Sequence, residues 1–251
     1  MKALILAAGY ATRLYPLTEN QPKPLLKVGE KPIIEHLTDK LAKNQDIDEI
    51  FVVTNARFYK NFAAWKEALL YKQKITLVND GTQSKEDRLG AIGDIWFTVQ
   101  TKNIGQDLMI FGGDNLFTDD LASFIAAFRS GKGSFIGLKD VHSKELAKLY
   151  SIVSLDAENR ITRFIEKPAD PDSTLISTLI YALKKDHLGL LPDAIAAGSA
   201  DRAGDFIKYL SERKPVFGHM IRGAWFDIGS FEQLKEADEA FKSNPVLHQE
   251  R

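Results

Sequence analysis

The chain has 251 residues, of which 44% are hydrophobic and 27% are charged, and its formal net charge is −1. This near-neutral balance argues against general binding to nucleic acid or membrane surfaces, since neither polyanion would be attracted. The sequence contains no cysteine, which excludes structural disulfides and thiolate zinc sites. It shows no signal-peptide pattern and no apolar run near the roughly 20 residues that span a bilayer, so we expect a cytoplasmic protein.

The first segment predicts a strand followed by a loop that could bind an anion. Residues 3–8 are apolar without a helical period and are followed by Gly9, which indicates a buried strand ending in a sharp turn. Small residues let a ligand approach backbone N–H groups, which can face an anion. Arg13 and Lys23, the latter between two prolines, supply the positive charge that such an anion needs. A plain surface turn remains an equal alternative from these residues alone.

Helical and strand-like segments then alternate along the chain. Apolar residues at helical spacing predict a helix over 33–43, and a buried strand follows over 49–54. A helix is expected over 58–70 and a strand over 74–78. This order predicts an α/β fold in which helices cover both faces of a mostly parallel sheet. Further strands are expected over 134–138, 151–155, 160–165 and 215–221, and further helices over 205–213 and 231–241.

Two aspartates follow glycine-rich or aromatic strand ends. Asp114 follows a hydrophobic strand and two glycines, which would place its carboxylate at the carboxyl edge of the sheet, where open α/β sheets bind ligands. Asp227 follows two aromatic residues and lies shortly before Gly229. A lone aspartate there is more often a turn former or a helix cap, and we expect Asp119 and Asp120 to cap a helix that runs through residue 128.

Residues 6–14 (Leu-Ala-Ala-Gly-Tyr-Ala-Thr-Arg-Leu) and 22–24 (Pro-Lys-Pro) resemble the signature of the sugar-phosphate nucleotidylyltransferases. Ala11 stands where this family mostly has a second glycine. The resemblance implies that Arg13 and Lys23 hold the triphosphate. It also implies that the nucleotide is bound around Leu6, Ala8, Gly9, Thr12, Gln83 and Gly90.

The later landmarks of the family follow in the expected order, up to about residue 241. By this resemblance Asp114 and Asp227 bind the metal, Glu166 contacts sugar hydroxyls and Lys167 contacts the sugar phosphate. Thr178 would border the sugar pocket, in a run over 177–179 that departs from the family pattern. The implied fold is a single three-layer α/β/α, Rossmann-like domain over 1–251, with a nucleotide-binding half to about residue 115 and an acceptor-binding half over about 116–241.

The resemblance implies a Mg²⁺-dependent condensation of a nucleoside triphosphate with a sugar 1-phosphate, which yields an NDP-sugar and pyrophosphate. An anionic phosphomonoester, with a second pKa near 6, would attack the α-phosphate in line without a histidine base. We lean towards dTTP or UTP with a hexose 1-phosphate. No nucleic-acid or membrane partner is expected, and a homo-oligomer is left open. Because no hexapeptide repeat follows, a second acyltransferase activity is not expected.

Two alternatives of other kinds remain open. The altered 177–179 run and Asn115 beside Asp114 leave room for a cytidylyltransferase that acts on a non-sugar phosphomonoester such as phosphocholine. The second alternative is a catalytically silent nucleotide-binding module. Loss of Asp114 or Asp227 would indicate such a module, and both aspartates are present. A Rossmann dehydrogenase lacks support because the first turn has no G-x-G-x-x-G, and a P-loop NTPase is excluded by the missing Gly-Lys-Ser/Thr.

Overall fold

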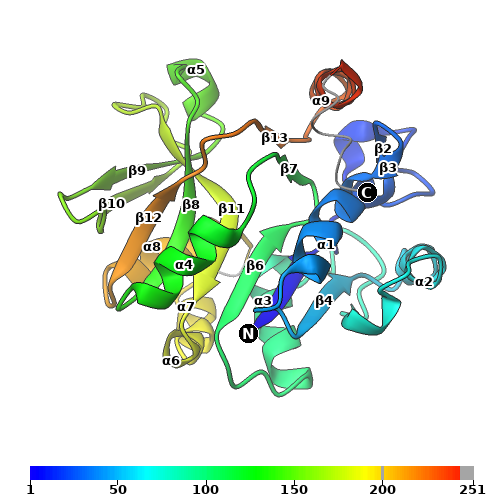
Figure 1. The fold of residues 1–251 in the computed structure, drawn as a ribbon, viewed down its shortest axis with the longest axis horizontal. Coiled ribbons are helices and arrows are strands. Elements are labelled where there is room, and N and C mark those ends of the chain that lie inside the picture. Colours follow the sequence, from blue (N-terminus) through cyan, green and yellow to red (C-terminus); the bar gives the residue numbers. More distant parts are fainter. Residues whose placement is uncertain (199–200, 244–251) are drawn as a thin grey trace. The chain divides into compact units, whose positions relative to one another are not determined.

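The computed structural model describes residues 1–198 and 201–243, which fall into two compact units. Unit 1 contains residues 1–2, 89–111 and 121–222, and unit 2 contains residues 3–88, 112–120 and the chain from 223 onwards. The chain therefore passes between the units several times, and residues that are distant in the sequence can meet within one unit. Each unit is an arrangement of helices and strands, which are labelled in Figure 1.

Unit 2 is built around parallel strands. The strands β1 (Lys2–Leu6), β4 (Glu49–Thr54) and β5 (Ile75–Asn79) are neighbours in this order, and β4 and β5 pair in parallel from Ile50↔Ile75 to Thr54↔Asn79. Helices α1 (Ile33–Lys43) and α2 (Tyr59–Glu67) follow β3 and β4 along the chain. The expected helix over 33–43 is confirmed, because its apolar stripe, including Leu37 and Leu41, is buried.

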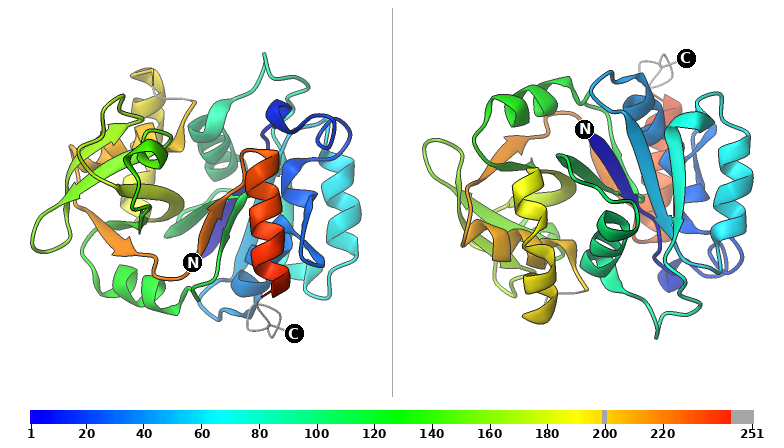
Figure 2. Two further views of the ribbon diagram at one scale, coloured as in Figure 1. Left: turned by 90° about the horizontal axis from the view of Figure 1, so that it is seen from above. Right: turned by 90° about the horizontal axis from the view of Figure 1, so that it is seen from below.

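Short elements complete unit 2. They comprise two 3₁₀ turns, η1 (Thr12–Leu14) and η2 (Lys23–Leu25), a third over Lys72–Lys74, and two two-stranded sheets. One sheet pairs β2 (Lys27–Val28) with β3 (Lys31–Pro32), and the other pairs β7 (Asn115–Phe117) with β13 (Trp225–Asp227). Helix α9 (Phe231–Ser243) lies beside β2 in this unit, as the left view of Figure 2 shows in red and blue.

A single hydrophobic cluster joins these short elements. Leu14 follows the first loop, Leu116 lies on β7, Ile228 follows β13 and Phe241 lies on α9, and all four are buried in the cluster with Val28. Burying apolar surface stabilises by about 25 cal/mol per Å². The N-terminal loop, β7, β13 and α9 are therefore held together by one core, although their sequences lie far apart.

Unit 1 carries a mixed sheet. The strands β10 (Ile161–Glu166), β9 (Ser151–Leu155), β11 (Leu175–Leu183) and β6 (Leu108–Gly112) pair in this order, and all three pairings are antiparallel. β8 (Ser134–Asp140) pairs antiparallel with β11 and parallel with β12 (Val216–Met220). The predicted α/β fold with a sheet is confirmed, and the antiparallel pairs are an addition that the sequence did not predict.

The helices of unit 1 are α3 (Gly90–Thr101), α4 (Ala122–Ser130), α5 (Lys144–Ala147), α6 (Lys185–Leu188), α7 (Leu191–Ala196) and α8 (Ala203–Ser211). The expectation that Asp119 or Asp120 caps the helix before residue 128 is wrong. Helix α4 has Leu121 at its N-cap without a side-chain cap, and the Asp119 carboxylate instead accepts a hydrogen bond from the Gly223 backbone N–H. Among the described residues, none of the helices combines the length and apolarity that a membrane span requires.

Candidate active site

The loop after β1 has the backbone geometry of a glycine-rich turn without the second glycine. Ala11 is left-handed, with φ 46° and ψ 41°. Its carbonyl accepts hydrogen bonds from the Leu14 N–H at 3.0 Å and from the hydroxyl of the buried Thr18 at 2.7 Å. A Cβ added at the exposed Gly9 would meet nothing within 4 Å, so a ligand can approach the backbone there. The loop therefore forms with Ala11 at the position where the family mostly has a second glycine.

Backbone carbonyls at two of the other predicted nucleotide-binding positions, at the end of β1 and just after it, accept hydrogen bonds from neighbouring segments. Ala8 is buried and its carbonyl accepts a hydrogen bond from the Asn55 amide at 2.9 Å, while the Leu6 carbonyl accepts one from the Gly113 N–H at 2.9 Å. Thr12 is exposed at the start of η1. Hydrogen bonds therefore connect the loop to Asn55, the residue after β4, and to the segment that carries Asp114.

Arg13 and Lys23 lie near the segment after Asp227. Arg13 is exposed, and its guanidinium comes within 3.8 Å of the position that a Cβ on Gly229 would take. Lys23 is largely buried, with a side chain 15% exposed, and its ammonium donates a hydrogen bond to the Ile228 carbonyl at 2.7 Å. The same ammonium pairs with the Asp114 carboxylate through Oδ2.

The two predicted metal-binding aspartates are brought together by the β7–β13 pair. Asp227 is the last residue of β13 and lies opposite Asn115, the residue after Asp114. The Ile228 N–H donates to the Asp114 carbonyl at 3.2 Å, which extends the pairing beyond both strands. Cross-strand partners in antiparallel pairs have Cα atoms about 4.5–5.5 Å apart, so the backbone of Asp227 lies opposite Asn115 and one residue along from the partner of Asp114.

A hydrogen-bonded chain orients the Asp114 carboxylate. The Trp225 indole N–H donates to the Asn115 Oδ1 at 2.9 Å, and the Asn115 amide donates to the Asp114 Oδ1 at 3.1 Å. Asn115 is only 4% exposed. Burial raises the pKa of Asp114, but the Lys23 ammonium and these hydrogen bonds outweigh it and hold the pKa below its ordinary value. The carboxylate is therefore ionised at neutral pH.

These two carboxylates fit Mg²⁺. Magnesium takes hard oxygen ligands and is usually held by one or two carboxylates, with water and substrate phosphates completing its octahedral shell. Within residues 1–198 and 201–243, no group of three or more His, Asp or Glu side chains is placed to hold a metal ion. Asp114, which is ionised, and Asp227 are two carboxylates of the kind that such a site uses.

The predicted nucleobase residues belong to different units. Gln83 is an exposed residue of unit 2, in a loop folded on the Asp87 carboxylate, which accepts from the Gln83 N–H at 2.9 Å and from the Ser84 N–H at 2.8 Å. Gly90 belongs to unit 1 and begins α3 with a φ of 78°. This φ favours glycine. Their roles remain predictions.

In unit 1, Glu166 ends β10 and accepts a hydrogen bond from the Ser151 hydroxyl. Arg202, immediately before α8, contacts Glu166 at 3.4 Å and Asp205 at 3.3 Å. Lys167 is exposed with φ 42°, and its N–H donates to the Tyr150 carbonyl at 3.1 Å. The sequence does not predict a role for Arg202, because a lone arginine before an amphipathic helix does not indicate which carboxylate it contacts.

Thr178 is placed differently from the other predicted acceptor residues. It is 1% exposed on β11, and its hydroxyl donates to the Gly137 carbonyl of β8 at 2.9 Å. This hydrogen bond satisfies its one donor within the sheet. Any contribution of Thr178 to an acceptor site would therefore be through the position of β11.

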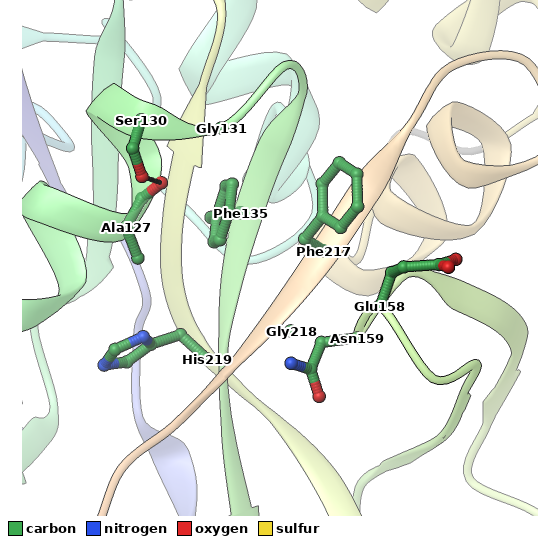
Figure 3. Close-up of a pocket in the computed structure, with 9 residues that line it drawn as sticks. All are labelled: Ala127, Ser130, Gly131, Phe135, Glu158, Asn159, Phe217, Gly218 and His219. Atoms are coloured by element: carbon green, nitrogen blue, oxygen red, sulfur yellow. Dashed lines mark hydrogen bonds between the residues drawn. The ribbon is translucent and has the colours of Figure 1, made fainter.

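Unit 1 also contains a cavity of about 330 Å³ that includes none of the predicted acceptor residues. Figure 3 shows it between the end of α4, β8, β12 and the turn at 158–159. The rings of Phe135 and Phe217 stack there, with centroids 5.3 Å apart and planes at 28°. Asn159 and His219 add polar atoms to its lining.

Comparison with known proteins places these observations in one family. The model of the nucleotidyl transferase family matches residues 2–244. The chain is 29% identical over 239 residues to a bifunctional protein GlmU of Methanocaldococcus jannaschii, and the match covers 95% of this chain and 53% of that relative. It is 27% identical over 252 residues to the GlmU of Methanococcus vannielii, with 97% and 56% covered.

The chain thus spans about half the length of these curated relatives. Among solved structures, a UDP-glucose pyrophosphorylase in complex with UDP-glucose superposes with a TM-score of 0.80 at 20% identity, and covers 96% of this chain and 98% of that one. This likeness shows that the fold is shared.

Proposed function

Because the chain belongs to the nucleotidyl transferase family, we propose that it joins a nucleoside triphosphate to a sugar 1-phosphate and releases pyrophosphate. The observation that carries the proposal is the β7–β13 pairing. It sets Asp227 opposite Asn115, beside Asp114, while Lys23 contacts both Asp114 and the residue after Asp227. Carboxylates that can hold a divalent cation, with a lysine beside them, suit phosphoryl-transfer chemistry, which depends on positioning and on cations beside the phosphates.

The chemistry needs no general base from the protein. The second pKa of a phosphomonoester is near 6, so the attacking oxygen is already anionic at neutral pH. The barrier comes from bringing two polyanions together and from the charge that grows on the leaving pyrophosphate. The protein would lower it by holding the reactants in line and by placing cations beside the phosphates.

We assign the triphosphate to unit 2. The exposed Gly9 turn offers its backbone to the nucleotide, and Arg13, exposed beside the Gly229 segment, would bind the β- and γ-phosphates. Asp114 and Asp227 would hold Mg²⁺, which when bound would neutralise charge on the α-phosphate. Lys23 would balance charge on the triphosphate, since its ammonium is already held at this site.

We assign the acceptor to unit 1. Glu166 would accept hydrogen bonds from sugar hydroxyls, and Lys167 would bind the sugar phosphate. Lys167 is exposed at the end of β10, and Arg202 adds a second cation beside Glu166. A hexose 1-phosphate with dTTP or UTP is the pair that we propose to test first.

The test is pyrophosphate release from a panel of four nucleoside triphosphates, each with hexose 1-phosphates or with phosphocholine. We expect release that depends on both a triphosphate and a sugar 1-phosphate. Asp114→Asn and Asp227→Asn should each lower turnover at least about a hundredfold, the size of one lost electrostatic stabiliser. Glu30→Gln, which removes a charge from an exposed residue of the same unit, should leave turnover unchanged.

The panel also separates the alternatives. Release with CTP and phosphocholine alone would indicate the cytidylyltransferase, and triphosphate binding without any release would indicate a silent module. Near-normal turnover in both aspartate variants would refute the proposed roles of Asp114 and Asp227.

A further inference from the structure

Both oxygens of the Asp114 carboxylate are engaged in this structure. Oδ1 accepts from the Asn115 amide at 3.1 Å, and Oδ2 pairs with the Lys23 ammonium. The same ammonium donates to the Ile228 carbonyl at 2.7 Å, so it is fixed between the Asp114 carboxylate and the backbone that follows Asp227. A positive charge therefore already contacts Oδ2 of Asp114 and the backbone carbonyl that follows Asp227.

The backbone of Lys23 is fixed, whereas its side chain can move away from Asp114. Pro22 and Pro24 flank Lys23, and residues 23–25 form the 3₁₀ turn η2, so the backbone is stiff at this point. The lysine side chain is a flexible chain of four carbons, so the ammonium can move while the backbone stays in place. With 15% of the Lys23 side chain and 27% of the Asp114 side chain exposed, water screens the pair only in part.

We propose that Lys23 blocks the divalent-cation position of Asp114 in the nucleotide-free protein and leaves it when a triphosphate binds. An ammonium and a divalent cation on one carboxylate oxygen repel each other, so the Lys23 ammonium weakens the binding of a divalent cation at Oδ2. The phosphates of the nucleotide offer Lys23 another anion, and its departure exposes Oδ2. This inference rests on the proposed function, because it takes Asp114 as a metal ligand.

One consequence is that the metal and the nucleotide bind cooperatively. Because Lys23 competes with a free divalent cation, the metal binds poorly alone and enters together with the triphosphate. By linkage, the nucleotide raises the affinity for the metal by the same factor as the metal raises the affinity for the nucleotide. Lys23 thereby keeps the site from filling with metal when no substrate is present.

The test measures Mn²⁺ binding by the nucleotide-free protein, from the electron paramagnetic resonance signal of unbound Mn²⁺. Lys23→Met removes the ammonium and keeps the length of the side chain. We expect this variant to bind Mn²⁺ at least about tenfold tighter than the wild type, the effect of losing one hydrogen-bonded charge. Lys27→Met, which removes an exposed lysine four positions along the same segment, should leave the Mn²⁺ affinity unchanged.

Two further variants complete the test. Lys23→Gln removes the charge and keeps a polar side chain, and it should also bind Mn²⁺ more tightly than the wild type, so the test remains decisive if Lys23→Met fails to fold. Adding Asp114→Asn to either Lys23 variant should abolish the tightening. Unchanged or weaker Mn²⁺ binding in a folded Lys23 variant would overturn the proposal. The assay contains no substrate, so this failure is distinct from a failure of pyrophosphate release, which would overturn the proposed function.

Discussion

Removing one or both hydrogen bonds of the chain from Trp225 through Asn115 to Asp114 should destabilise the protein by different amounts. Asn115→Ala removes a hydrogen bond to a charged group, worth about 1.5–3 kcal/mol, and the neutral bond from Trp225, worth about 1 kcal/mol. We expect the free energy of unfolding to fall by about 3 kcal/mol. Trp225→Phe removes the neutral bond and leaves the Asn115 amide on Asp114, and it should lower the free energy of unfolding by about 1 kcal/mol.

The two variants should also differ in turnover. Without the Asn115 amide, the Asp114 carboxylate loses the partner that fixes Oδ1, and kcat should fall about tenfold, which corresponds to about 1.4 kcal/mol of barrier. Urea unfolding followed by circular dichroism measures the stability, and pyrophosphate release measures kcat. Equal stability losses in the two variants, or an unchanged kcat in Asn115→Ala, would contradict the orienting role of Asn115.

Three further results are expected. Ala11→Gly should raise the free energy of unfolding by about 1 kcal/mol, because φ 46° strains an alanine and not a glycine; a lower stability in urea unfolding would argue against this. Because the pKa of Asp114 is depressed, its ion pair stabilises the protein above the unfolded pKa of about 3.9 and is lost at lower pH. The stability difference between wild type and Asp114→Asn should therefore shrink below about pH 4, and a constant difference down to pH 2 would contradict it. Arg13→Ala should raise the KM for the triphosphate and lower kcat, and unchanged values of both would remove Arg13 from the site.

Much of the fold could be predicted because apolar patterns determine which segments are helices and strands. The apolar stripe over 33–43 correctly predicted helix α1, and the buried apolar run over 49–54 correctly predicted strand β4. The family match over residues 2–244 confirms the predicted family. The antiparallel pairing of β11 with β6 and β9 could not be predicted, because side-chain alternation indicates a strand but not its partner or direction. Helix α2 is also shorter than the predicted 58–70.

The meeting of Asp114 and Asp227 followed only from the family resemblance. Strands β7 and β13 that join them have three residues each, which is too short for a periodic signal. The contacts of Lys23 with Asp114 and of Arg202 with Glu166 are long-range pairings that no local pattern encodes. The catalytic roles of the predicted site residues remain predictions, as does the division into nucleotide and acceptor halves.

The central claim is that Asp114 and Asp227 act on one shared divalent cation. The most direct measurement is the turnover of Asp114→Asn, Asp227→Asn and the double variant, each with saturating substrates and Mg²⁺. Residues that act as a unit are strongly non-additive, so we expect each single variant to lose at least about a hundredfold and the double variant to lose little more. Losses that multiply to about ten-thousandfold in the double variant would show independent roles and contradict the shared site.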